Sequence, residues 1–406
     1  MNTSIIFGSV IGVFVTIFFT EYLGRKGTTN LGLLTTAIGL VLMLIHSQAC
    51  AVIGVFLYSG GLANSFTIIT TFIVEFFPEK NNAQYFNLIT ISFAVGTAIN
   101  PIAFYFILDY RQILIYVFLL PVIITLIGFY FIVENTPIEL IAADDYNETY
   151  NAFMRIAKWN GVTDHGLTLE GVKEIKDEYD ENQRKKHAKV FSIVDIVRFK
   201  SLRSQLFPMG ANRFIIAFLF FAPALLLNQF QLNIYIDGLI IAFSKLWALL
   251  VQYILIKTKR RTANYILFSA TLFFAIGIYL SETLCHNCEN NIVQTIFNFG
   301  YRVTSSALSF MVILISNEFY PAQVRNLGAV TVTTIGRSSI LLVPFVAQFC
   351  TMIHLNFFIL LCILAILGMI VTYFMAETFG IPAPEMIEEV EMGEHHYQHY
   401  EINKRS

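Results

Sequence analysis

The chain has 406 residues, of which 56% are hydrophobic and 13% are charged, and its mean hydropathy is +0.64. A soluble domain carries roughly 25% charged residues, so this composition excludes an ordinary soluble protein and predicts one embedded in a lipid bilayer. The formal net charge of −2 excludes a basic field that would attract nucleic acid.

Charge-poor stretches recur along the chain at about 20 residues, the length that spans a bilayer as a helix. Five of them precede a long polar segment, near residues 3–20, 28–46, 51–75, 85–107 and 112–133. Six follow it, near residues 207–228, 234–256, 263–281, 292–316, 327–350 and 355–375. The sequence therefore predicts an all-α, polytopic membrane protein with about eleven transmembrane helices.

The long polar segment divides the chain into two similar halves. A basic turn, EYLGRKGTTN after the first span and KTKRRTANY after the seventh, occurs in both halves, and many transporters are built from such repeats. Charged, helix-like stretches within the polar segment suit a solvated or membrane-surface helix. The expected domains are an N-terminal bundle at 1–133, a central segment at 134–203, a C-terminal bundle at 204–376 and a tail at 377–406.

Lys and Arg are distributed unevenly between alternate connections. Of the 26 in the chain, 4 lie inside predicted spans and 21 of the other 22 lie in one set of connections, leaving only Arg111 in the other set. Basic residues favour cytoplasmic loops. We therefore expect an integral membrane protein of the plasma membrane, with the central segment and the C-terminus in the cytoplasm and Met1 on the outer side.

Four short elements resemble signatures of the major facilitator superfamily, in the right order across nearly the whole chain. EYLGRKG resembles the motif after its helix two, VENTPIEL the element after helix six, NEFYPAQVRNLG the element after helix ten, and AETFGIPAPEMIEEVE the closing element. The third element resembles the organic cation and anion transporter family especially closely. On this resemblance the family's helix one is absent, and we expect a longer reading frame upstream of Met1.

The resemblance implies a gating cluster at the cytoplasmic helix ends of each half. Charge-assisted hydrogen bonds there clamp neighbouring helix ends until the repeats rock, with Glu318 and Arg325 expected as one pair. The alternative is that these residues merely anchor helices at the interface. Ile138 and Glu139 depart from the family, which has Arg-Trp there. The predicted gating residues are Glu21, Arg25, Lys26, Glu75, Arg260, Arg261, Glu318 and Arg325.

Four basic residues lie inside predicted spans: Arg213, Lys245, Arg302 and Arg337. A basic side chain near mid-bilayer costs about 2.5–3.5 kcal/mol on insertion scales, so it needs compensation. By the resemblance, Lys245 and Arg337 fall where the cation-transporting branch has acids, whereas Arg302 matches a common family arginine. We predict that Lys245 and Arg337 bind an anionic substrate, with Arg213 as a third contact. Snorkelling towards the interface is the alternative.

Phe66 is a further candidate for the substrate pocket. It falls where the resembling transporters carry a pocket tryptophan, and an aromatic wall suits the apolar body of an organic ion. Plain helix packing is the equally open alternative.

Together these features predict a transporter of small organic ions, anions in preference to cations, that works by alternating access. Two alternatives stay open: a transport-deficient relic that acts as a structural or regulatory membrane subunit, and a sugar transporter with similar motifs. We predict no enzyme and no cofactor, since the chain has no Gly-x-x-x-x-Gly-Lys phosphate-binding loop, and no metal. The expected partners are the organic ion and the lipid bilayer, and not nucleic acid.

Overall fold

The computed structural model describes most of the chain, and all structural statements concern the residues it describes. These are 2–76, 82–142, 145–162, 166–185, 193–225, 234–284, 292–321, 324–380 and 390. Regular structure in this part of the chain is helical, without a β-strand. The all-α class predicted from the sequence is confirmed.

The chain divides into two compact units. Unit 1 comprises Met1–Phe86 and Leu114–Val190, and unit 2 comprises Asn87–Ile113 and Phe191–Ser406. Most of helix α3, Asn82–Phe106, therefore groups with unit 2. The domain boundaries expected from the sequence stay a prediction.

Unit 1 begins with helix α1, Asn2–Leu44, which is interrupted at Gly24. There φ is 68° and ψ is −178°, a conformation that a residue with a Cβ atom adopts only under strain. The two arms on either side of Gly24 correspond to the spans predicted near 3–20 and 28–46. A single glycine, rather than a loop, thus connects the first two spans.

Helix α2, Gln48–Phe76, packs against both arms of α1 where glycine backbones meet. A Cβ atom on Gly12 would overlap the carbonyl oxygen of Gly60, and one on Gly61 would overlap that of Gly32. Small residues allow this close approach of helices in membrane bundles. Direct backbone packing therefore holds α1 and α2 together.

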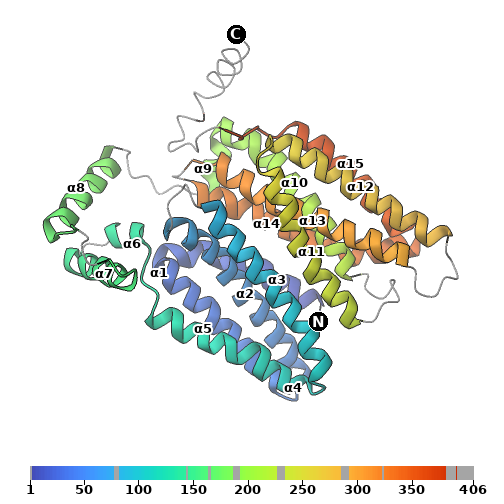
Figure 1. Cartoon of the computed structure of the whole chain (residues 1–406), viewed down its shortest axis with the longest axis horizontal. Helices are drawn as coiled ribbons and strands as arrows, with labels where there is room; N and C mark the ends of the chain where they lie inside the picture. Colours follow the sequence, from blue (N-terminus) through green and yellow to red (C-terminus); the bar gives the residue numbers. More distant parts are fainter. Residues whose placement is uncertain are drawn as a thin grey trace, which may run out of the picture. The chain divides into compact units, whose positions relative to one another are not determined.

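The rest of unit 1 contains most of the last span of the first half and the described part of residues 134–190. A π-helix, η2 (Leu114–Leu119), leads into α5 (Leu120–Phe131). Three short helices lie beyond the end of α5 (Figure 1): α6 (Pro137–Ala142), α7 (Tyr146–Trp159) and α8 (Leu169–Lys185). The helices expected in the polar segment are present.

Unit 2 contains the short helices α4 (Tyr110–Ile113) and α9 (Ile193–Arg198) and a set of long helices. The long helices are α10 (Lys200–Leu225), α11 (Ile234–Leu255), α12 (Arg260–Leu284), α13 (Ile292–Phe319), α14 (Arg325–Met352) and α15 (Phe357–Tyr373). Helices α12 and α15 lie side by side (Figure 1), and the Phe268 ring fills the space beside Gly368. Leu219, Tyr301 and Leu361 are fully buried in the same core.

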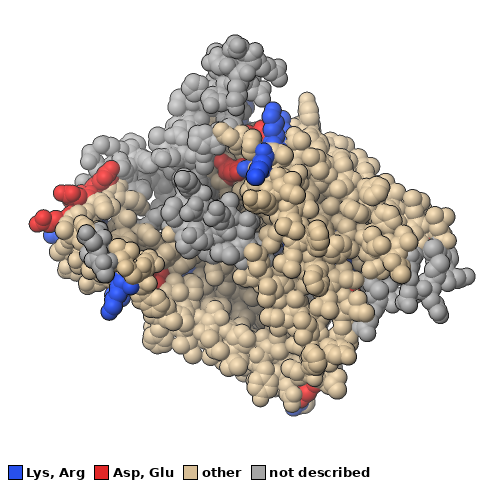
Figure 2. Space-filling model, viewed as in Figure 1, with Lys and Arg blue, Asp and Glu red and all other residues tan. Residues whose placement is uncertain are grey.

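Eight helices of the described residues are long and apolar enough to cross a membrane. Three shorter apolar helices, Ser4–Thr16, Ile91–Phe106 and Phe357–Tyr373, raise the total to eleven, at the eleven positions predicted. Figure 2 shows broad uncharged surfaces, with charged side chains gathered on α7 and α8, at α4 and near the start of α12. This distribution suits helices surrounded by lipid.

Candidate functional site

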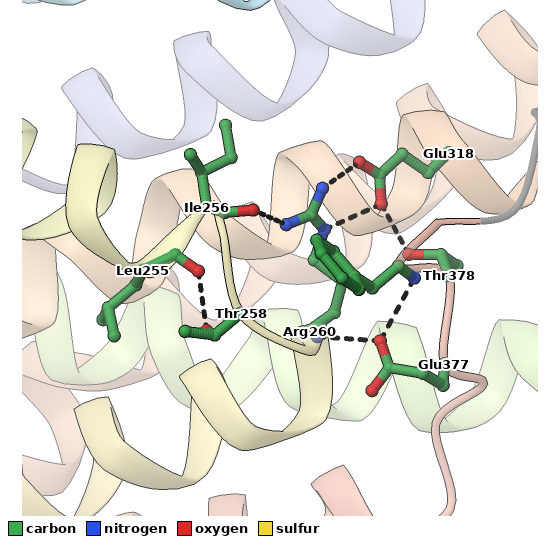
Figure 3. A network of polar contacts seen from close by, with 8 residues as sticks. Leu255, Ile256, Thr258, Arg260, Glu318, Glu377 and Thr378 are labelled. Carbon is green, nitrogen blue, oxygen red and sulfur yellow. Dashed lines mark hydrogen bonds and ion pairs between the residues drawn. The ribbon is translucent and has the colours of Figure 1, made fainter.

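Two of the gating residues predicted for unit 2, Arg260 and Glu318, meet at the start of α12 (Figure 3). The Arg260 guanidinium donates to both carboxylate oxygens of Glu318 on α13, at 3.0 Å from Nε and 2.7 Å from Nη2. Its Nη1 donates to the carbonyl oxygen of Ile256 at 2.5 Å. The Arg260 and Glu318 side chains are 9% and 23% exposed, so this two-point ion pair is largely withdrawn from water.

The segment after α15 completes this network. Glu377 accepts hydrogen bonds from the backbone N–H groups of Arg260 and Arg261, at 2.7 and 3.1 Å. Such N–H groups lie at the start of a helix, where they have no intrahelical partner and carry the positive end of its dipole. The Thr378 hydroxyl donates to Glu318 at 2.5 Å. Charge-assisted hydrogen bonds thus join α12, α13 and the chain after α15.

In unit 1, a carboxylate likewise accepts a backbone N–H at the start of a helix, at the interruption of α1. Glu139, on α6, accepts a hydrogen bond from the backbone N–H of Arg25 at 2.6 Å. The carboxylate contacts the Arg25 guanidinium at one point, with a nitrogen–oxygen distance of 3.4 Å. Glu139 is one of the positions where the sequence departs from the family pattern. The resemblance could therefore not identify it as the partner of Arg25.

A second ion pair in unit 1 was not predicted from the sequence. Arg155 on α7 donates to both carboxylate oxygens of Glu134, at 2.5 and 3.0 Å. These hydrogen bonds, and the charges of Arg155 and Lys26, hold the pKa of Glu134 below its ordinary value. The positive charge of Lys26, a predicted gating residue, thus helps to lower the pKa of the Glu134 carboxylate in the same unit.

Three predicted gating residues, Glu21, Glu75 and Arg325, have side chains outside the described part of the structure, and their roles stay predictions. The expected pairing of Arg325 with Glu318 is among these. The Glu318 carboxylate itself is bound by Arg260 and Thr378.

Lys245 on α11 is buried, with 7% of its surface exposed. Its ammonium group donates a 2.8 Å hydrogen bond to the Thr97 hydroxyl on α3 and lies 4.0 Å from the centre of the Phe93 ring. Both of these partners are uncharged. A hydroxyl and a ring face offset part of the desolvation of an ammonium group, and an anion would offset more.

A buried ion pair in unit 2 was also missed by sequence reasoning. Arg302 on α13 lies 3.3 Å from the Asp237 carboxylate near the start of α11, and it donates to Asn298 at 3.1 Å. Asp237 and Arg302 are 4% and 7% exposed. Asp237 lies close enough to the end of its predicted span to pass for an interfacial residue. The sequence contains no signal for the pair, because Asp237 is the fourth residue of its predicted span and Arg302 is the eleventh of its own.

Arg213 ties α10 to α13, because its guanidinium donates to the carbonyl oxygen and the hydroxyl of Ser309, at 2.7 and 3.0 Å. Its side chain also packs against Gly336 on α14, the residue before Arg337. The structure thus brings Arg213 and the chain at Arg337 together within unit 2.

Phe66 lies on α2 in unit 1 and is 38% exposed. Substrate binding by Phe66, Lys245, Arg213 and Arg337 stays a prediction.

The chain matches the profile of the Major Facilitator Superfamily over residues 1–344. It belongs to this superfamily. The superfamily comprises membrane transporters, and the family predicted from the sequence is confirmed. By its family, this major facilitator protein is an integral membrane transporter and not an enzyme.

Relatives of this major facilitator protein include transporters of organic ions. Organic cation/carnitine transporter 2 of Rattus norvegicus is 24% identical over 396 residues, covering 96% of this chain and 68% of that protein. Organic anion transporter 3 of Mus musculus is 23% identical over 350 residues, covering 85% of this chain and 63% of that protein.

The fold is shared with solved structures of a bacterial transporter. The xylose transporter XylE from E. coli, in an inward-open conformation, has a TM-score of 0.65 at 18% identity, covering 96% of this chain and 87% of that chain. A double tryptophan mutant of XylE has a TM-score of 0.68 at 15% identity, covering 96% and 87%. At these identities the likeness concerns the fold alone.

Proposed function

We propose that this major facilitator protein carries small organic ions across the plasma membrane by alternating access, with anions preferred to cations. The observation that carries the proposal is the charge balance inside the spans of unit 2. Within the spans predicted from the sequence for this part of the chain, four basic residues, Arg213, Lys245, Arg302 and Arg337, lie with one acid, Asp237. Asp237 binds Arg302, whereas the hydrogen bonds of Lys245 with Thr97 and of Arg213 with Ser309 go to uncharged oxygens.

The contacts of Lys245 and Arg213 support this proposal. Thr97 and Phe93 surround the Lys245 ammonium, and Ser309 binds Arg213 through neutral oxygens. A buried charge without an opposite charge is unfavourable in a bilayer, so a bound anion would stabilise this part of unit 2. Arg337, with its planar guanidinium, is suited to two-point binding of a carboxylate.

The relatives support the substrate class but not the sign of its charge. Their names include both an organic cation/carnitine transporter and an organic anion transporter. The preference for anions therefore rests on the residues of this chain. Phe66 is proposed to contact the apolar body of the substrate, and the gating residues to hold one access state.

Uptake into vesicles tests the proposal. The purified chain is reconstituted in liposomes and offered a labelled aromatic carboxylate or a labelled quaternary ammonium ion of similar size. We expect carboxylate uptake, its loss in Arg337→Asp and Lys245→Glu, and a smaller reduction in Arg213→Gln. Lys173→Glu, a charge reversal on α8, serves as the control. Ammonium uptake that Arg337→Asp leaves unchanged would contradict the anion preference.

The two alternatives make different predictions in the same vesicles. Several buried amides of unit 2, Asn212, Gln252, Asn264 and Asn298, carry an atom without a hydrogen-bond partner, and amides are the groups that bind sugar hydroxyls. Uptake of a labelled pentose instead of either ion would favour the sugar transporter. A folded protein that carries none of the three would favour the transport-deficient relic.

We propose the orientation that the distribution of Lys and Arg predicts, with the central segment and the C-terminus cytoplasmic. Single cysteines in a cysteine-free background test it with a membrane-impermeant thiol reagent on intact cells. A cysteine next to Lys185 should be protected and one next to Asn287 should be labelled. The opposite pattern would reverse the orientation.

A further inference from the structure

Helix α7 has one covered face and one uncovered flank. On the covered face, Ala152 is fully buried, and the Thr149 hydroxyl donates a 2.7 Å hydrogen bond to the carbonyl oxygen of Leu140 on α6. From α8, Lys176 lies 5.0 Å from the centre of the Tyr146 ring. The neighbouring helices therefore account for the apolar residues on this face.

The uncovered flank ends in an exposed tryptophan. Trp159, the last residue of α7, is 72% exposed, and Val162 in the following turn is 46% exposed. Lys158 stands beside Trp159 and is also exposed. Trp159 follows Arg155 by four residues, so both lie on the same side of the helix, about one turn apart. Packing within unit 1 does not explain this apolar end of α7.

The Arg155–Glu134 ion pair places this flank next to the end of a membrane span. Glu134 comes three residues after Phe131, the last residue of α5, and binds Arg155 at 2.5 and 3.0 Å. Tyr130 and Phe131, at the end of α5, are 61% and 77% exposed. Aromatic side chains at the end of a span are typical of the boundary between lipid and water. The flank of α7 is therefore held at the level of that boundary.

We propose that the Trp159 end of α7 inserts into the lipid headgroup layer beside α5, with Lys158 directed towards anionic headgroups. Tryptophan favours this layer because its ring is apolar and its indole N–H finds polar partners there. A basic side chain next to it is attracted by the negative surface potential of anionic lipids. The ion pair of Arg155 with Glu134 sets the depth at which α7 lies.

A protein partner fits this patch less well than a bilayer does. Trp159 and Val162 are two apolar side chains beside a lysine, whereas stable protein interfaces bury at least about 1,000 Å². The Arg155–Glu134 ion pair also links α7 to the end of α5, a predicted span with exposed aromatic residues at this end. Contact with another protein is one of the outcomes that the test distinguishes.

The fluorescence of the chain's two tryptophans tests the proposal, because each can be observed alone. Trp247→Phe leaves Trp159, and Trp159→Phe leaves Trp247, which is 54% exposed on α11 within a predicted span. Each variant is reconstituted in phosphatidylcholine vesicles, with or without phosphatidylserine, that carry brominated lipids. Circular dichroism and gel filtration confirm that both variants are folded as the parent is.

We expect the Trp159 emission to be shifted to the blue and quenched more by bromines near the headgroups than by bromines near the chain ends. The Trp247 emission should show quenching by the deeper bromines. Lys158→Glu should reduce the quenching of Trp159 in vesicles with phosphatidylserine, whereas Lys173→Glu on α8 should not.

Two results would overturn the proposal. Emission of Trp159 typical of water, with full quenching by acrylamide and none by brominated lipid, would place it in solvent. Blue-shifted emission that no brominated lipid quenches would assign Trp159 to a contact with protein, either within the chain or with a second copy.

Discussion

The basic turns of the two units share one contact and differ in another. In both, a carboxylate from after the last span of its half accepts the backbone N–H of the turn: Glu139 binds Arg25 in unit 1, and Glu377 binds Arg260 in unit 2. In unit 2 a second carboxylate, Glu318, binds the guanidinium at two points, whereas in unit 1 Glu139 itself also contacts the Arg25 guanidinium, at one point. The two turns thus share the hydrogen bond from a backbone N–H at the start of a helix to a carboxylate. They differ in the carboxylate that contacts the guanidinium.

The units also differ in what joins their helices. In unit 1, α1 and α2 meet at glycines such as Gly12 and Gly60, with backbone against backbone. In unit 2, α12 and α13 are joined at one end by Arg260 and Glu318. Close packing depends on shape and is insensitive to salt, whereas ion pairs depend on charge. Substitutions in unit 1 should therefore lower stability by separating packed helices, and substitutions in unit 2 by removing an ion pair.

Glu318→Gln should have the largest effect. It leaves the Arg260 guanidinium without its carboxylate partner in a site largely withdrawn from water, and breaking such a pair costs about 3 kcal/mol. Thermal unfolding in detergent measures the loss, with Glu174→Gln on the exposed surface of α8 as the control. If Glu318→Gln unfolds at the same temperature as the parent, the ion pair does not hold unit 2 together.

Gly12→Ala tests the backbone packing of unit 1. The added Cβ atom would overlap the carbonyl oxygen of Gly60, so the helices must separate, at an expected cost of about 1–3 kcal/mol. Gly128→Ala on α5 is the matched control, because a Cβ atom there meets nothing within 4 Å. We expect the control to be neutral or slightly stabilising, since alanine favours helix. Equal melting temperatures for the two variants would refute the close packing.

Glu139→Gln measures the weaker ion pair of unit 1. The amide oxygen can still accept the Arg25 N–H, and the contact that is lost is a single one at 3.4 Å between partly exposed side chains. We expect a loss of about 0.5–1 kcal/mol. Glu139→Leu, which also removes the acceptor, should cost more. If Glu139→Gln lowers the free energy of unfolding as much as Glu318→Gln does, the ion pairs of the two turns do not differ in strength.

The Glu134–Arg155 pair should give the smallest effect, and one that depends on pH. The pKa of Glu134 in the folded protein is lowered from its ordinary value of 4.5, chiefly by the hydrogen bonds from Arg155. The stabilisation is therefore complete above about pH 5 and is lost as the pH falls through the lowered pKa. Arg155→Gln should flatten this part of the curve of melting temperature against pH. An unchanged curve would show that the pair contributes nothing measurable.

Properties that depend on consecutive residues could be predicted from the sequence. Apolar runs predicted the helices, because the bilayer imposes a length on each run. The motifs drew attention to Arg260 and Glu318, which the structure brings together, although the pair expected was Glu318 with Arg325 and a gating role stays a prediction. Partners set by helix packing were not predictable: Glu139 departs from the family pattern, and Thr97 reaches Lys245 only because α3 lies against α11. Such pairs depend on how the helices pack against one another, and a single sequence does not show that packing.

The interruption of α1 at Gly24 limits how this part of the protein can evolve. With φ at 68°, the backbone there favours glycine, and a Cβ atom would lie 2.7 Å from the Glu139 carboxylate that binds Arg25. Every change at the first or second base of a glycine codon introduces either a side chain or a stop, whereas changes at the third base are synonymous. Each such missense change at Gly24 would strain the connection between two spans and displace a carboxylate more than a hundred residues away. Natural variation at this codon should therefore be almost entirely synonymous.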